Sequence, residues 1–117
     1  MKQLEAAVVQ CGILDQTIYH LDGPDAIKHL PLLYDLPDNC PAIQWVHGAG
    51  SGPMTKWIDL LKEIQANGKG LHISCGSDEV ETLLTELSSK GLFIQTHASS
   101  VEEADAMIAL AGKLAHE

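Results

Sequence analysis

The chain has 117 residues, of which 45% are hydrophobic, and a formal net charge of −9. This length suits one unit with its own core, so we expect residues 1–117 to form a single domain. The negative charge argues against a nucleic-acid partner and against an anionic membrane surface, because both need a basic protein face.

No apolar run approaches 18 residues and no signal peptide is recognisable, which predicts a cytoplasmic protein without a membrane partner. The cysteines Cys11, Cys40 and Cys75 are odd in number and form no CxxC pair. This pattern favours reduced thiols over a disulfide framework or a thiolate zinc finger.

The amino-terminal third predicts a helix, a strand and a second helix. Residues 3–14 carry apolar positions at three- and four-residue spacing, which is typical of a helix. Residues 16–21 form the first predicted strand, because they include threonine, isoleucine and tyrosine, which favour the pleated conformation. Gly23 permits a turn into a helix over residues 25–36, which Pro31 is expected to kink or shorten.

After a loop at residues 37–41, the chain alternates strands with helices. The predicted strands cover residues 42–47, 71–75 and 92–96, and the predicted helices cover residues 53–66, 77–90 and 101–114. Gly68 gives a left-handed stop signal, Ser77 is a predicted cap, and Ser100 with Glu103 matches a capping box. One helix followed by four βα units predicts an α/β fold, with a parallel sheet in order 1-2-3-4 and helices on one face.

Polar side chains collect where the predicted strands end. The chain has only 6 histidines, yet three of the four strands finish on or near one. In parallel α/β folds the carboxyl ends of the strands and the following loops form the ligand site. The sequence therefore predicts a polar rim, built from His20, Asp22, His47, His72, Cys75 and His97.

Within this rim we distinguish a metal group from a ligand-binding group. His20, Asp22 and His97 are expected to converge, and two imidazoles with a carboxylate suit zinc, iron or another divalent transition ion. The ligand-binding candidates are His47, Trp45, His72 and Cys75.

Simpler explanations remain for several of these residues. Asp22 can serve only to start the following helix, and His72 can be a hydrogen-bonded interior residue of its strand. Trp45 fits a core as well as a pocket wall. The loop Gly48–Gly52 lacks a P-loop ending, so it is either a plain connection or a place where a ligand approaches the backbone closely.

From Tyr19 onward the chain resembles the carboxyl-terminal half of the uroporphyrinogen decarboxylase-like superfamily. This group includes the uroporphyrinogen decarboxylases and the corrinoid and coenzyme M methyltransferases. The segments that carry the resemblance are Tyr19-His20-Leu21-Asp22-Gly23-Pro24, Ile43-Gln44-Trp45-Val46 with Gly48-Ala49-Gly50, Gly70-Leu71-His72-Ile73, and Gly91-Leu92-Phe93-Ile94 followed by Ser100-Val101-Glu102-Glu103-Ala104.

The resemblance implies a fold in which this chain supplies the last four βα units of a TIM-type (β/α)8 barrel. The arginine-rich motif and the catalytic aspartate of the decarboxylases lie upstream of the matching region. The methyltransferases hold zinc with a His-x-Cys pair and a later cysteine. This chain has His20-x-Asp22 at the first position and His97 near the later one, so its metal group differs in ligand type.

Three functions follow as hypotheses. The chain can be a truncated half-barrel that binds a small ligand or a partner half-barrel without complete catalytic machinery. It can be a metal-dependent, methyltransferase-like or decarboxylase-like enzyme that is active as a homodimer. It can also be a degenerate relative without chemistry. In the first two cases we expect a homodimer, or a partner chain that supplies the missing half-barrel, because a half-barrel leaves two sheet edges open.

Overall fold

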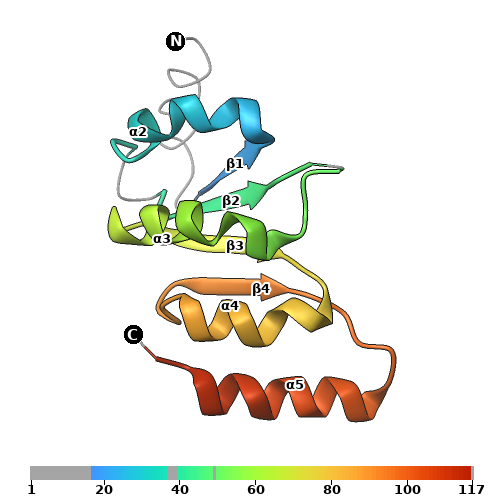
Figure 1. Ribbon diagram of the computed structural model, residues 1–117. Coiled ribbons are helices and arrows are strands. Elements are labelled where there is room, and N and C mark those ends of the chain that lie inside the picture. The colour runs from blue at the N-terminus through green and yellow to red at the C-terminus, as the bar shows by residue number, and fades with distance from the viewer. Residues whose placement is uncertain (1–16, 37–39, 49, 117) are drawn as a thin grey trace.

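A single four-stranded parallel sheet organises the molecule. The computed structural model describes residues 17–36, 40–48 and 50–116. The sheet order is β1-β2-β3-β4 with every neighbouring pair parallel, as the sequence predicted (Figure 1). The strands are β1 (Ile18–Asp22), β2 (Ala42–Val46), β3 (Gly70–Ser74) and β4 (Leu92–Gln95). The predicted helix over residues 3–14 and Cys11 lie outside the described residues.

A helical segment follows every strand, and the first three segments each begin with a 3-10 turn. They are η1 (Pro24–His29) with α2 (Leu30–Leu33), η2 (Met54–Trp57) with α3 (Ile58–Ala66), η3 (Ser77–Glu79) with α4 (Val80–Glu86), and α5 (Val101–Leu114). Pro31 stands in the first turn of α2, which has only four residues, so the predicted shortening is confirmed. Within the described part of the chain, no helix is long and apolar enough to cross a membrane.

Two predicted helix boundaries near α4 are wrong. The helix ends at Glu86 rather than near residue 90, because Leu87 is extended and fully buried. The Gln65 amide then holds Ser88 in place, donating to its carbonyl at 2.8 Å and accepting from its backbone N–H at 3.1 Å. Before α4, the cap residue of the 3-10 turn η3 is Gly76 rather than Ser77, and the Gly76 N–H donates to the Glu79 carboxylate at 2.9 Å.

The core lies between the sheet and the helices. Every second strand residue faces this side, as the pleat requires, and is buried or half-buried there. Ile43 and Trp45 of β2 and Ile73 of β3 are fully buried, and they pack with Leu61 and Ile64 of α3. The helices therefore cover one face of the sheet, and α3 and α4 lie in front of it in Figure 1.

The opposite face of the sheet has no buried residue among those described. It carries the alternate strand positions, which are Ile18, His20, Asp22, Ala42, Gln44, Val46, Gly70, His72, Ser74, Phe93 and Gln95. All-parallel sheets are normally covered on both faces. Among residues 17–36, 40–48 and 50–116, no helix packs over this face, and we call it the uncovered face.

Candidate functional site

One row of side chains crosses the uncovered face from edge to edge. The strand register places His20 opposite Gln44, Gln44 opposite His72, and His72 opposite Phe93. These four positions have the same pleat direction, so their side chains are neighbours on one face. We call this set the cross-strand row.

Contacts within the cross-strand row hold its two histidines. The His20 Nδ1 lies 2.8 Å from the Gln44 Oε1. Because an amide oxygen only accepts, Nδ1 carries the proton in this contact. The His72 and Phe93 rings meet edge to face, with centroids 4.7 Å apart and an interplanar angle of 76°.

His72 has hydrogen-bonding capacity that the described chain does not use. Its Nε2 atom is buried and has no hydrogen-bond partner. A buried polar atom of this kind costs free energy unless a partner reaches it. The predicted alternative of a hydrogen-bonded interior histidine is therefore not met at this nitrogen, because the described residues supply no partner for it.

His20 and Asp22 form a pair at the carboxyl end of β1. The Nε2 of His20 lies 3.9 Å from the Asp22 Oδ2, and both side chains are exposed. With Nδ1 engaged by Gln44, this nitrogen is the one free to face the carboxylate. The pair supplies two donor atoms of the types that divalent transition ions accept.

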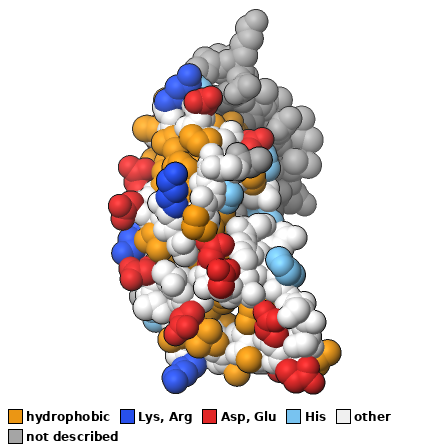
Figure 2. Space-filling model, turned by 45° about the vertical axis from the view of Figure 1, so that its right-hand side comes forward, with side chains coloured by type: hydrophobic (Ala, Val, Ile, Leu, Met, Phe, Trp, Pro, Cys, Tyr) orange, Lys and Arg blue, Asp and Glu red, His pale blue; other side chains and the backbone are white. Residues whose placement is uncertain are grey.

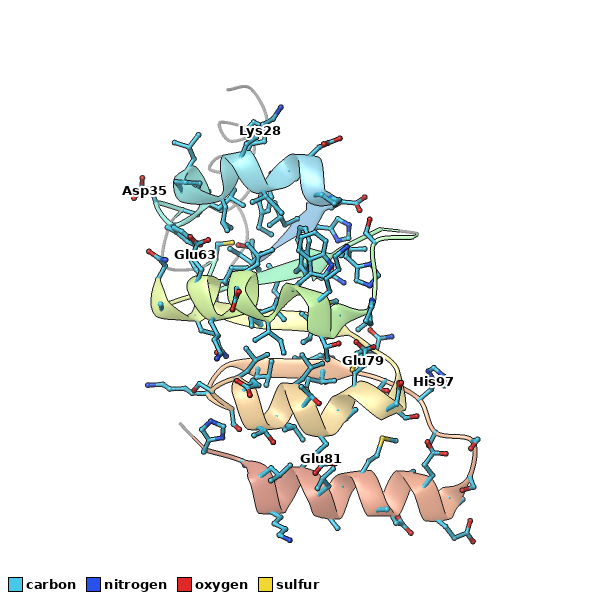
Figure 3. The ribbon with its side chains drawn as sticks, in the orientation of Figure 1. Lys28, Asp35, Glu63, Glu79, Glu81 and His97 are labelled. Carbon is cyan, nitrogen blue, oxygen red and sulfur yellow. The ribbon has the colours of Figure 1, made fainter. Side chains whose placement is uncertain are left out.

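His97 is on the same rim but far from this pair. It follows β4, and β1 and β4 are the two edge strands, so three strand spacings separate them, or about 14 Å. In Figure 3 His97 lies just beyond the end of β4. Over residues 17–36, 40–48 and 50–116, no group of three His, Cys, Asp or Glu side chains is placed to hold a metal. Within one copy the structure brings together His20 and Asp22 but not His97.

The ends of β3 and β4 enclose an open hollow of about 430 Å³. Histidine side chains gather on the side where the strands end, with acidic groups near them (Figure 2). The hollow is lined by Ser74, Cys75, Gly76, Gln95, Thr96 and His97. Two of the predicted residues, Cys75 and His97, thus share one site at this rim.

Trp45 lies on the opposite face from the cross-strand row. It is fully buried in the core, and its ring packs edge to face on Trp57 with centroids 5.3 Å apart. Of the two predictions for this residue, the core position is the one observed. It supports β2 from beneath rather than lining the polar face.

His47 is held by the loop that follows β2. Its Nδ1 donates to the Gly48 carbonyl at 2.7 Å, and a side chain at position 52 would meet the imidazole at 2.9 Å. Trp57 donates from its indole N–H to the Ser51 carbonyl at 2.8 Å. The loop is therefore tied to its surroundings, and glycine at position 52 allows its close approach to His47.

The Cys75 thiol is protonated at neutral pH. Burial is the main cause that raises the pKa of this thiol to about 11, and the negative charges of Glu79 and Asp78 raise it further. The nearby Thr96 hydroxyl lowers the pKa and so offsets part of the increase. A protonated thiol is a weak nucleophile and a poor metal ligand. Cys75 is thus suited to lining the hollow rather than to reacting in it.

This state predicts slow alkylation of Cys75. Because the pKa is about two units above the ordinary value, the thiolate fraction at pH 8 is lower by roughly 100-fold. We expect the iodoacetamide rate, followed by peptide mass spectrometry, to keep rising up to about pH 11. Glu79→Gln removes one negative charge and should increase the rate at pH 8. A rate that levels off near pH 9 in the folded protein would refute this assignment.

Gln44 and Phe93 are the site residues that the sequence did not single out. Gln44 stands between the buried residues Ile43 and Trp45, so strand alternation already places it on the other face. Its position between two histidines depends on the pairing of three strands.

Comparisons of the chain with models of protein families, with curated proteins and with solved structures give no match.

Proposed function

We propose that this chain is a cytoplasmic half-barrel of the (β/α)8 type, related to the uroporphyrinogen decarboxylase-like superfamily. Joined to a second half, it binds a small polar ligand on the inner face of the completed barrel. The chain itself does not carry complete catalytic machinery. The free thiols of Cys40 and Cys75 fit a reducing compartment.

One observation carries this proposal: a row of polar side chains crosses the uncovered face of the sheet from β1 to β3. Barrel interiors filled only for stability are dominated by valine, isoleucine and leucine. Here the cross-strand row supplies two imidazoles and an amide instead. Such groups fix the orientation of a hydrogen-bonding ligand, and Phe93 adds an apolar surface beside them.

A thermal-shift screen tests ligand binding directly. The probes are panels of small carboxylates, amides and phosphate esters, tested on the wild type and on His72→Phe. This variant keeps a ring beside Phe93 but removes the unpartnered nitrogen. We expect compounds that raise the wild-type Tm to have at least ~10-fold weaker affinity for the variant, equivalent to ~1.4 kcal/mol. Equal shifts in both proteins would place binding elsewhere, and no shift with any panel would contradict the proposal.

A second candidate function is a metal-dependent, methyltransferase-like or decarboxylase-like enzyme active as a homodimer. The His20–Asp22 pair favours it, because the imidazole is oriented by Gln44 in the way that metal-binding histidines usually are. One copy supplies two of the three protein ligands that a catalytic zinc site needs. A further ligand from a second copy, such as His97, is required for this candidate.

Zinc binding separates the two candidates. For the metal enzyme we expect zinc to raise the wild-type Tm by several degrees and to leave His20→Ala unchanged, because the site loses an imidazole ligand. His29→Ala is the matched control, since it removes a histidine from η1, away from the pair. If wild type and His20→Ala respond alike, His20 does not hold a metal.

A further inference from the structure

We infer that β4 of one copy pairs with β1 of a second copy, with Gln95 opposite Ile18 and His97 opposite His20 of that copy. Two such seams close an eight-stranded barrel. The inference rests on the proposed half-barrel and specifies its partner and its contact register. It follows from where apolar side chains remain exposed and from the geometry of the last helix.

Exposed large hydrophobic side chains are confined to the two edge units of the described chain. Phe93, Val101 and Ile108 lie on β4 and α5 and are 61%, 72% and 72% exposed. Ile18 on β1 is 56% exposed, and Leu32 on α2 is the fifth exposed large side chain. The inner units, β2 with α3 and β3 with α4, carry none. Association through the two edges therefore covers the apolar surface that folding leaves exposed.

The last helix, α5, lies where it could pack on a further strand next to β4, and one copy of the chain does not provide that strand. α5 has 14 residues and buries none of them, whereas α2, α3 and α4 each bury at least two. Figure 1 shows α5 beyond the β4 edge of the sheet. A strand added at that edge would lie beneath α5 and give its apolar side chains a partner.

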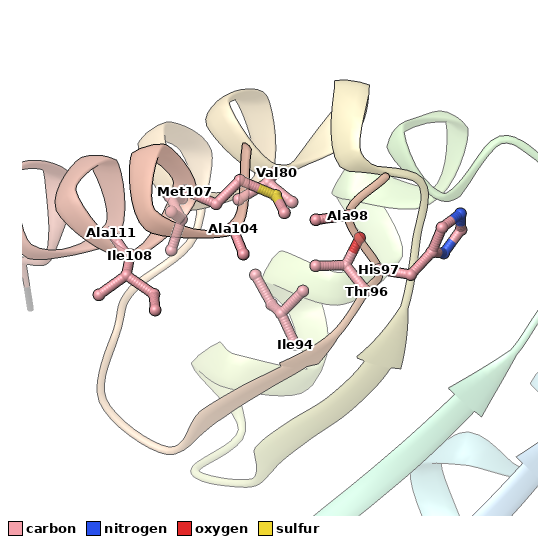
Figure 4. Close-up of a pocket in the computed structure, with 10 residues that line it drawn as sticks. Val80, Ile94, Thr96, His97, Ala98, Ala104, Met107, Ile108 and Ala111 are labelled. Atoms are coloured by element: carbon pink, nitrogen blue, oxygen red, sulfur yellow. The ribbon is translucent and has the colours of Figure 1, made fainter. Parts of the chain in front are cut away.

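A groove beneath α5 marks the same place. It has a volume of about 320 Å³ and is mostly apolar, between β4, α4 and α5. Ile94 and Met107 line it, and Ile108 lies on its wall although this side chain is largely exposed (Figure 4). His97 points away from the groove in this view. The exposed position of Ile108 indicates that one side of the groove is open.

A second copy fits this edge because its β1, the first strand of the same series, is an edge strand of the described sheet. Each consecutive βα unit adds its strand next to the preceding one in parallel, so the strand after β4 must also run parallel to it. β1 of a second copy meets this condition. A two-fold axis along the barrel then makes both seams identical, which gives a closed dimer.

Barrel geometry sets the register of the seam. A (β/α)8 barrel has a total shift of about 8 residues, so each identical half contributes about four. Viewed from the helix side, the strands tilt to the right of the barrel axis, and successive strands also follow one another to the right. A row of paired residues that runs perpendicular to the strands therefore moves toward their amino-terminal ends as it goes around the barrel. The row that starts at His20 and crosses the sheet to Phe93 therefore meets the second copy about four residues before its His20. This offset pairs Gln95 with Ile18, and it brings His97 beside His20 and Asp22 across the seam.

Disulfide cross-linking in the full chain tests this register. Cys11→Ser and Cys75→Ala remove two native cysteines that would complicate the assignment of disulfides, and buried Cys40 is kept. In this background, Ile18→Cys with Gln95→Cys should give a covalent, reducible dimer on mild oxidation, since opposed residues on paired strands are close enough for a disulfide. Both positions are exposed, so the substitutions leave the core intact.

The matched control is Asp22→Cys with Gln95→Cys, which moves one cysteine about 13 Å along β1 on the same face. We expect its cross-linking to be at least ~10-fold slower, because the register separates the two thiols. His20→Cys with His97→Cys is a second in-register pair and should also cross-link. Equal rates in the control, or no cross-link in either in-register pair of a dimeric protein, would overturn the seam and leave the ligand site standing. A monomeric protein would reject both the seam and the closed barrel.

Discussion

Replacing Trp45 with alanine is expected to lower the free energy of unfolding by about 3–5 kcal/mol. The side chain is fully buried between the sheet and the helices, and it contacts the Trp57 ring. Its removal leaves a large cavity in a core that can close around it only partly. Urea denaturation followed by circular dichroism measures the loss, which is a large fraction of the about 5–15 kcal/mol that stabilises a typical domain.

Trp57→Ala is the matched control for this change. Trp57 is only half-buried, so the same loss of an indole should cost clearly less than at Trp45. Comparable losses at the two positions would contradict the core assignment of Trp45. A Trp45→Ala variant with wild-type stability but altered ligand response would instead make this residue a pocket wall.

Ile108→Asp is expected to raise the dimer dissociation constant by roughly 100-fold or more. The inferred seam covers this side chain, which is 72% exposed in one copy. Each lost apolar contact is worth about 1.5–3 kcal/mol, and a closed dimer loses two of them. The fold of each copy should persist, because α5 buries no residue. Sedimentation over a concentration series measures the constant.

Ala109→Asp provides the control in the same helix. This neighbour is also exposed but is not among the residues that line the groove. It introduces the same charge at nearly the same helical position, so it accounts for general effects of an aspartate in α5. Equal weakening by both variants would indicate a different contact surface from the one inferred here.

Much of the fold could be predicted because strand and helix periodicities are local. Alternation around Ile43 and Trp45 predicts a strand, and repeated βα spacing predicts the parallel order that the sheet adopts. Pro31 predicts the short α2. The early end of α4 was missed, because it depends on the contact between Gln65 and Ser88, which lie far apart in sequence.

The site was harder to predict because it depends on pairing between strands. The sequence places histidines at a common rim, yet a rim is a line of strand ends rather than a point. His20 and His97 therefore fall on opposite edges of the sheet. Gln44 escaped notice because nothing in its local sequence shows that histidines lie on both neighbouring strands. Register is set by the faces that the whole sheet buries.

The mass of the wild-type protein in solution is the most direct test of the half-barrel account. Static light scattering at tens of micromolar should give twice the 12.6 kDa of one chain. A closed barrel with two seams predicts this value, with an interface above roughly 1,000 Å². A mass of 12.6 kDa across that concentration range would contradict the account.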